Sequence, residues 1–265
     1  MIELRNITKS YRLEDGTKRY VFRDLNFVFP EGANIGLIGR NGAGKSTLMR
    51  IIGGIEVPDR GEVITDKRIS WPVGLGGMAG SLTGRDSVKF VCRVYGTSHE
   101  EMLEKVRFVE KFAEIGEYFD QPIRYYSSGM RARLNFGTSL AFDFDYYLMD
   151  EVGAVGDAAF KAKSGRILQE RIANSHVIMV SHSMSEIARL CNVVVLVQDG
   201  QALLYSDVEE GIEAYQKMVG DVGRKPLKEK GENALYKNLP LEDRKKIMEL
   251  RRQIRGLRQA ALTKS

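Results

Sequence analysis

The chain has 265 residues, of which 43% are hydrophobic, and this is enough to bury the core of one domain. Its formal net charge of +5 is concentrated in residues 220–265, which carry 13 Lys and Arg against 6 Asp and Glu. No apolar run approaches the roughly 20 residues that cross a bilayer, and Cys92 and Cys191 stand far apart, so the sequence excludes a transmembrane helix, a disulfide framework and a cysteine zinc site.

The N-terminal residues alternate between apolar and polar side chains, beginning with Ile2 and Leu4. They lack the apolar core of a signal peptide, so we expect a cytoplasmic protein. Residues 1–30 predict strands that flank a polar turn at 14–18 and form an antiparallel edge subdomain.

A glycine-rich loop follows the apolar run 35–38 and precedes apolar residues at helical spacing. It comprises Gly39, Arg40, Asn41, Gly42, Ala43, Gly44, Lys45, Ser46 and Thr47. A loop of this kind between a strand and a helix binds nucleotide phosphates, because its backbone N–H groups converge on them at the positive end of the helix. We expect Lys45 to reach the β- and γ-phosphates of ATP and the Ser46 hydroxyl to ligate Mg²⁺.

Residues 84–142 are rich in apolar side chains at helical spacing and predict a helical subdomain. Within this range, Ser127, Ser128 and Gly129 open a predicted helix. A hydroxyl and free backbone N–H groups at a helix start form a site for an anion, although the same residues also serve as an ordinary helix cap.

The apolar run 146–149 ends in two adjacent carboxylates, Asp150 and Glu151. Because side chains alternate along a strand, the two carboxylates point to opposite sides. Asp150 can then hold Mg²⁺ through water, while Glu151 faces the γ-phosphate and orients or deprotonates the attacking water. Further predicted strands and a final helix complete an α/β pattern: 176–180, 193–198, 201–205 and 208–218.

In this order, the motifs resemble those of ATP-binding-cassette (ABC) nucleotide-binding subunits. Residues 126–130, Tyr-Ser-Ser-Gly-Met, stand where that family has its Leu-Ser-Gly-Gly-Gln signature, and Ser127 and Gly129 match it. The resemblance implies a P-loop ATPase with a mixed central sheet, whose signature meets the ATP of a partner subunit. One cassette per chain then implies a homodimer with two sandwiched ATP molecules.

The same resemblance implies roles for three further elements. The ring of Tyr11 would stack on adenine, residues 154–157 would lie at the dimer interface, and His182 would contact the γ-phosphate and help to hold water and Glu151 in place. From position along the chain we prefer His182 to His99 and His176 for this role. Tyr11 would equally serve as a half-buried tyrosine at the end of a strand.

Residues 69–85 resemble a narrower branch of the family. They lack the glutamine that the family usually carries here and contain a Trp-Pro-Val-Gly-Leu run that starts at Trp71. This run and the signature resemble ATP-binding subunits of capsular polysaccharide exporters of the polysialic-acid type. The likeness covers residues 1–218, within a nucleotide-binding domain that we place at 1–219.

The resemblance to this branch implies ATP-driven export of lipid-linked capsular polysaccharide across the bacterial inner membrane. The partner would be a transmembrane permease pair, with the chain held peripherally at the cytoplasmic face, and envelope-spanning export proteins are further candidate partners. O-antigen, teichoic acid or another lipid-linked glycan is the alternative cargo.

Two other classes of protein compete with an exporter. A soluble ABC ATPase that remodels nucleic acid or ribosomes commonly has two cassettes or a long coiled coil, and neither is present in this sequence, so we expect no nucleic-acid partner. A cassette that only binds ATP is disfavoured because Lys45, Asp150, Glu151 and His182 are all present.

Residues 220–265 predict a linker followed by a basic amphipathic helix. Its apolar side chains recur three and four residues apart, at Ile247, Leu250, Ile254, Leu257 and Ala261. Three functions stay open for this helix: docking on its own or the neighbouring subunit, anchoring on acidic lipid headgroups, or contacting nucleic acid.

Overall fold

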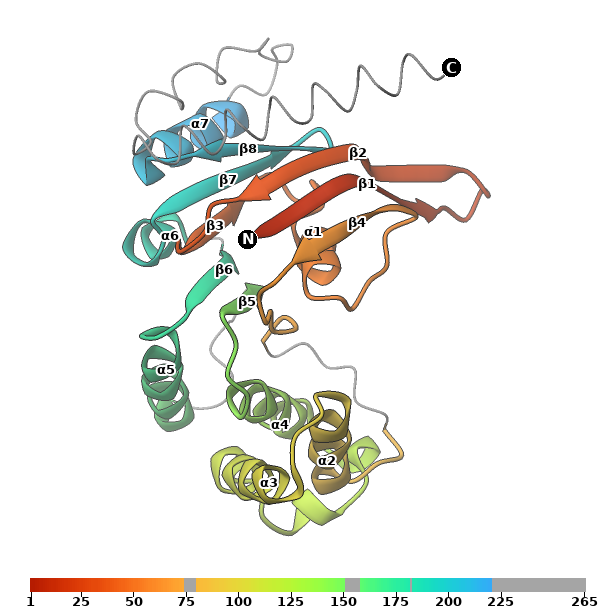
Figure 1. Cartoon of the computed structure of the whole chain (residues 1–265), viewed down its shortest axis with the longest axis vertical. Helices are drawn as coiled ribbons and strands as arrows, with labels where there is room; N and C mark the ends of the chain where they lie inside the picture. The colour runs from red at the N-terminus through yellow and green to blue at the C-terminus, as the bar shows by residue number, and fades with distance from the viewer. Residues whose placement is uncertain (74–79, 151–157, 182, 221–265) are drawn as a thin grey trace. The chain divides into compact units, whose positions relative to one another are not determined.

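The structure is a computed structural model that describes residues 1–73, 80–150, 158–181 and 183–220. The chain divides into two compact units, Met1–Gln216 and Lys217–Ser265. Figure 1 follows the helices and strands of the first unit along the chain. The predicted domain boundary at 219 stays a prediction, and the basic helix predicted beyond residue 220 lies outside the described residues.

A three-stranded antiparallel sheet, in the order β2-β1-β4, forms from the N-terminal part of the chain. Its strands are β1 (Ile2–Arg12), β2 (Lys18–Phe29) and β4 (Arg60–Thr65). The apolar side chains that alternate along β1, including Ile2 and Leu4, are buried. The expected antiparallel edge sheet is therefore confirmed.

The second sheet has five strands in the order β5-β6-β3-β7-β8. They are β3 (Ile35–Ile38), β5 (Tyr146–Asp150), β6 (His176–Val180), β7 (Val193–Gln198) and β8 (Gln201–Tyr205). The first four in this order run parallel, and β8 pairs antiparallel with β7. This confirms the predicted mixed central sheet.

Strand β3, which leads into the phosphate loop, lies between β6 and β7. All four of its residues are buried, as expected of a central strand that is covered on both faces. Leu37 pairs with Val180 of β6, and Val180 pairs with Asp150 of β5. The carboxyl ends of three parallel strands therefore meet at one edge, where open α/β sheets bind ligands.

Helix α1 (Lys45–Ile52) joins the two sheets through one hydrophobic core. Its buried residues Leu48, Met49, Ile51 and Ile52 share this core with residues of β1, β2, β3, β5, β6 and β7. Each fully buried Leu or Ile side chain stabilises the fold by about 1.5–3 kcal/mol. The phosphate loop is thus held at both ends, by a central strand and by a well-packed helix.

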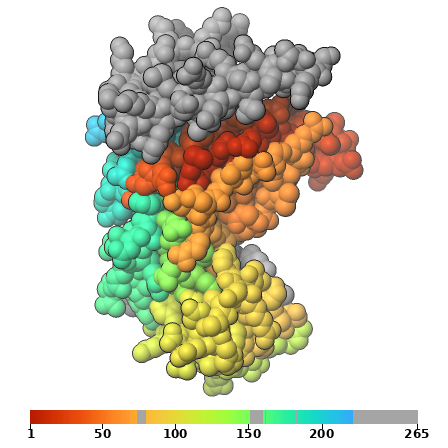
Figure 2. Space-filling model, viewed as in Figure 1, coloured from red at the N-terminus to blue at the C-terminus, as the bar shows by residue number. Residues whose placement is uncertain are grey.

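The segment that was predicted as a helical subdomain contains α2 (Gly84–Val94), α3 (His99–Ala113) and α4 (Ser128–Leu140), with short 3₁₀ turns at Gly116–Asp120 and Ile123–Tyr125. Helix α3 begins with a complete capping box between Ser98 and Glu101. The ring of Phe112 stacks on Phe136 of α4 and meets Phe160 edge to face, at ring-centroid distances of 6.1 and 5.1 Å. Figure 2 shows the surface of this segment in yellow to green.

Three further helices lie among the strands of the second half: α5 (Ala158–Ile172), α6 (Met184–Leu190) and α7 (Val208–Gly220). Ser183 caps α6 by accepting a hydrogen bond from the backbone N–H of Glu186. Across the described part of the chain, no helix is both long enough and apolar enough to cross a bilayer.

Candidate nucleotide site

The phosphate loop has a shape that only glycine allows at two positions. Gly44, the N-cap of α1, has φ 104°, and a Cβ there would lie 2.4 Å from Val21 Cγ1 and 2.8 Å from Phe22 Cζ. A Cβ on Gly39 would lie 2.4 Å from the carbonyl oxygen of Val197 on β7. The loop therefore lies directly against the strands, and its backbone is free to face a ligand.

The charges at this end of α1 suit an anion. The Lys45 ammonium donates to the carbonyl oxygens of Gly39 and Arg40 at 2.8 and 3.1 Å, so the side chain folds back over the loop. The first turn of α1 carries no acidic side chain. Backbone N–H groups, the helix dipole and an ammonium thus converge at one place, as a polyphosphate requires.

The other predicted residues of the loop surround this point. Asn41 and Gly42 are exposed, Ala43 and Ser46 are partly buried, and Thr47 is buried in the first turn of α1. The Ser46 side chain stands one residue after Lys45 at the start of the helix. Its hydroxyl and the loop glycines fit a Mg²⁺–ATP complex by type and place.

Asp150 closes β5 at the same edge of the sheet. Two strand spacings of about 4.8 Å place it roughly 10 Å from Leu37, close to the loop that follows β3. That separation leaves room for a hydrated cation between Asp150 and the phosphates. Glu151 and His182, the residues that follow β5 and Ser181, lie outside the described residues. Residues 154–157 also lie outside them.

The segment before residues 74–79 is fixed to β5. Ser70 donates its backbone N–H to the carbonyl oxygen of Tyr146 at 2.9 Å, and Val73 donates to that of Leu148 at 2.7 Å. The Trp71 ring packs on three other rings at centroid distances of 5.6–5.9 Å, from Tyr95, Phe142 and Phe144. These contacts tie the strand that carries Asp150 to Tyr95, the residue that follows α2.

The signature residues present an exposed helix start. Ser127 is the N-cap of α4, and its Oγ accepts a hydrogen bond from the Met130 N–H at 3.2 Å. Ser127, Ser128 and Gly129 are exposed. The first backbone N–H groups of α4 and the Ser128 hydroxyl are therefore accessible to a ligand from another chain.

Tyr126, which replaces the leucine of the family's signature, is buried with 3% of its surface exposed. Its hydroxyl donates to the carbonyl oxygen of Tyr118 at 2.5 Å and accepts from the Gly84 N–H at 3.2 Å. Burial raises the pKa of this hydroxyl, so it stays protonated and able to donate. The substitution thus ties the start of α4 to the start of α2.

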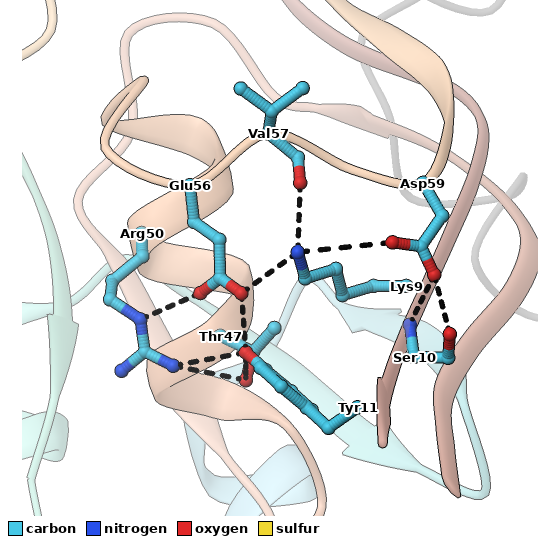
Figure 3. Close-up of polar contacts among 8 residues, drawn as sticks. All are labelled: Lys9, Ser10, Tyr11, Thr47, Arg50, Glu56, Val57 and Asp59. Atoms are coloured by element: carbon cyan, nitrogen blue, oxygen red, sulfur yellow. Dashed lines mark hydrogen bonds and ion pairs between the residues drawn. The ribbon is translucent and has the colours of Figure 1, made fainter. Parts of the chain in front are cut away.

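Tyr11 lies at the end of β1, with 37% of its surface exposed. Its hydroxyl donates to Glu56 Oε1 at 2.6 Å, accepts from Arg50 Nη2 at 3.2 Å and lies 3.2 Å from Thr47 Oγ1. Figure 3 shows these contacts together with Lys9, whose Nζ lies 3.0 Å from Glu56 Oε1. Tyr11 is thus joined to the phosphate-loop helix through its hydroxyl.

Sequence reasoning missed Arg50, Glu56 and Arg19 at this site. Burial alone would raise the pKa of Glu56, but hydrogen bonds from Tyr11, Arg50 and Lys9 outweigh it and lower the pKa to about 2. Arg19 pairs with Tyr11 across β1 and β2, and a Cβ on Gly42 would lie 3.6 Å from its guanidinium. None of the three residues stands in a motif, although Arg19 follows from the strand register.

Comparison with known proteins supports one family. Residues 22–154 match the model of the ABC transporter family. The chain is 57% identical over 219 residues to the polysialic acid transport ATP-binding protein KpsT of Escherichia coli, covering 82% of this chain and 99% of that protein. It is 41% identical to the capsule polysaccharide export ATP-binding protein CtrD of Neisseria meningitidis, over 82% of this chain and all of CtrD.

A more distant relative is named for a different cargo. The O-antigen export system ATP-binding protein RfbB of Klebsiella pneumoniae is 35% identical, over 79% of this chain and 86% of RfbB. Among solved structures, a dimeric ATP-binding cassette in a post-hydrolysis state with ADP and Pi superposes with a TM-score of 0.59 at 23% identity, over 76% of this chain and 96% of that one. This last likeness supports the fold.

Proposed function

The chain belongs to the ABC transporter family and is an ATPase of that class, and we propose that it drives the export of a capsular polysaccharide across the bacterial inner membrane. The observation that carries the proposal is the phosphate loop after β3, where only glycine fits at positions 39 and 44. The chain that carries this loop is 57% identical to a polysialic acid transport ATP-binding protein. The loop supports the binding of ATP, and the names of the relatives support the class of cargo.

Different described residues would bind the phosphates, the Mg²⁺ ion and the adenine of ATP. The backbone N–H groups at the start of α1 and the Lys45 ammonium bind the β- and γ-phosphates and stabilise charge as it develops on them. Ser46 and Asp150 would hold Mg²⁺, which neutralises phosphate charge when bound. The ring of Tyr11 would stack on adenine, as its exposure and its place beside α1 permit.

We assign the activation of water to Glu151 and His182 from their positions in the sequence. Glu151 follows Asp150 directly at the end of β5, where a carboxylate can orient or deprotonate the attacking water. His182 comes two residues after the end of β6, the strand between β5 and β3. We propose that it contacts the γ-phosphate and helps to hold water and Glu151.

ABC cassettes work as dimers, and a homodimer follows here because one chain carries one phosphate loop and one signature. Ser127, Ser128 and Gly129 are exposed at the start of α4, as needed to bind the γ-phosphate of the partner subunit's ATP. ATP binding would close this dimer, and hydrolysis would reopen it.

The dimer would act on a separate permease pair, and so lie peripherally at the cytoplasmic face of the inner membrane. Large apolar side chains on α2 and at its end are exposed and available to such a partner: Phe90, Val94 and Tyr95. The lipid-linked polysaccharide would be handled by the permease, and envelope-spanning export proteins would complete the path.

Sequence identity to the relatives ranks the candidate cargoes. Relatives named for polysialic acid or capsule transport are 41–57% identical to this chain, against 35% for the O-antigen relative. We therefore place a capsular polysaccharide before O-antigen or teichoic acid. A nucleic-acid remodelling role has no support among these names.

The test is a deletion of the gene in its host, complemented with wild type or with Glu151→Gln. Capsular polysaccharide should accumulate inside the deletion strain, and only the wild-type gene should return it to the surface. A normal surface capsule in the deletion strain, with no second capsule exporter present, would remove the capsule as cargo. It would leave the ATPase assignment in place.

A further inference from the structure

Two elements that are distant in sequence are joined by one carboxylate near the end of β1. Glu56 lies in the loop between α1 and β4, and 18% of its side chain is exposed. Its Oε1 accepts from the Tyr11 hydroxyl at 2.6 Å and from the Lys9 ammonium, and its Oε2 accepts from Arg50 Nε at 2.8 Å. Both oxygens are therefore used, and Glu56 joins Lys9 and Tyr11 to Arg50.

The positions of these partners relate them to the nucleotide. Lys9 and Tyr11 belong to β1, whereas Arg50 stands in the last turn of α1, the helix that starts at the phosphate loop. Lys9 is anchored further by donating to the carbonyl oxygen of Val57 at 2.9 Å. Figure 3 shows the Glu56 carboxylate between the Lys9 ammonium, the Tyr11 hydroxyl and the Arg50 guanidinium.

The Tyr11 ring would otherwise have considerable freedom. It is 37% exposed, so packing alone does not define its orientation. The Lys9 Nζ lies 5.5 Å from the ring centroid, over one face. Three contacts to the hydroxyl then fix the tip of the ring, and so the direction of its long axis, from Glu56, Arg50 and Thr47. A ring that is already fixed loses less freedom when a base stacks on it.

We propose that Glu56 is a positioning residue for the adenine site: through Tyr11 it holds the stacking ring in place without touching the nucleotide. This inference rests on the proposed ATP-binding function of the chain and adds a residue that no motif marks. Its consequence is that Glu56 contributes to the affinity for the base of ATP and contributes nothing to the affinity for the phosphates.

The experiment compares two probes on the full-length protein: MgATP, and inorganic tripolyphosphate with Mg²⁺, which has the phosphates without the base. Glu56→Gln keeps the size of the side chain, but one amide cannot accept on both sides. Its NH₂ group must face either Arg50 Nε or the pair Tyr11 and Lys9, all of which donate. The ring then loses part of its support.

We expect Glu56→Gln and Tyr11→Phe each to weaken MgATP binding by about 3- to 10-fold, the factor that ordering one side chain on binding costs. Tripolyphosphate binding should not change. The double variant should bind MgATP as weakly as either single variant, because both changes break the same contact. Glu62→Gln is the matched control, since its side chain is 66% exposed on β4 and its ion pair is a loose one of 3.9 Å with Arg5.

The other results of this binding experiment would overturn either the role of Glu56 or the proposed function. Equal loss of both probes in Glu56→Gln would show that Glu56 stabilises α1 and the loop, and would overturn the proposal. Additive losses in the double variant, or unchanged MgATP affinity in Glu56→Gln, would overturn it as well. Failure of the wild-type protein to bind MgATP would instead refute the proposed function itself, so the two failures are distinguishable.

Discussion

Substitution of Gly44 by alanine tests whether the phosphate loop is shaped by its contact with β2. The residue has φ 104°, a conformation that costs an L-residue about 1–2 kcal/mol. The new Cβ would also lie 2.4 Å from Val21 Cγ1 and 2.8 Å from Phe22 Cζ, and such overpacking costs about 1–3 kcal/mol. Together we expect a loss of about 2–5 kcal/mol in the free energy of unfolding.

The measurement is thermal and urea denaturation of the purified protein. For a domain of this size, a loss of that order lowers Tm by about 4–20 °C. Gly32→Ala is the matched control, because Gly32 has φ 72° with nothing within 4 Å of an added Cβ. It carries the conformational cost without the clash, so we expect a loss of only about 1–2 kcal/mol.

The same pair of variants separates stability from binding. The Gly44→Ala loop must move away from β2, which displaces the N–H groups at the start of α1, so MgATP and tripolyphosphate should both bind more weakly. Gly32→Ala should bind both as the wild type does. The reasoning is refuted if Gly44→Ala is no less stable than Gly32→Ala, since the contact with Val21 and Phe22 would then impose no strain.

Three further predictions follow from other parts of the chain. Glu151→Gln should trap a closed dimer in MgATP, seen by size-exclusion chromatography with light scattering, and steady hydrolysis at the wild-type rate would remove Glu151 from its proposed role. Tyr126→Phe leaves the Gly84 N–H without its acceptor and should cost about 1–3 kcal/mol in urea denaturation. Tyr118→Phe, at a half-exposed position, should cost less than about 0.5 kcal/mol, and equal losses would contradict the argument. Folding lowers the pKa of Glu56 from 4.5 to about 2, so its contribution is present above pH 4.5 and is lost as the pH falls toward 2. The stability difference between wild type and Glu56→Gln should therefore shrink between pH 5 and pH 2.5, and a constant difference would rule this out.

The central sheet could be predicted largely because its four parallel strands are buried, whereas the antiparallel strand β8 is partly exposed. The runs 176–180, 193–198 and 201–205 coincide with β6, β7 and β8, and 146–149 falls one residue short of the end of β5. Parallel strands covered on both faces give near-continuous apolar sequences between turns, and this signal is local. The loop after β3 was predictable for the same reason, since its glycines, lysine and hydroxyl lie side by side in sequence.

The supports of the site could not be predicted, because they depend on contacts between distant elements. Glu56 acts on Tyr11 only after β1 has come to lie beside α1, and no spacing within residues 45–60 encodes that approach. Tyr126 was recognised as a departure from the signature, yet its role depends on the backbone of Gly84 and Tyr118. The roles of Glu151 and His182 in hydrolysis stay predictions from the sequence.

Helix α1 contacts both halves of the proposed nucleotide site: it begins at the phosphate loop, and its residues Thr47 and Arg50 meet Tyr11 of β1. Its start carries Lys45 and the N–H groups that suit phosphates, and its last turn carries Arg50. Thr47 and Arg50, three residues apart, lie on one face of the helix, and both reach the Tyr11 hydroxyl. A movement of α1 against β1 would therefore change the proposed phosphate contacts and the orientation of the Tyr11 ring together. Because α1 packs into the core shared by both sheets, such movement is costly. The spacing between the two half-sites is thus fixed before ATP binds.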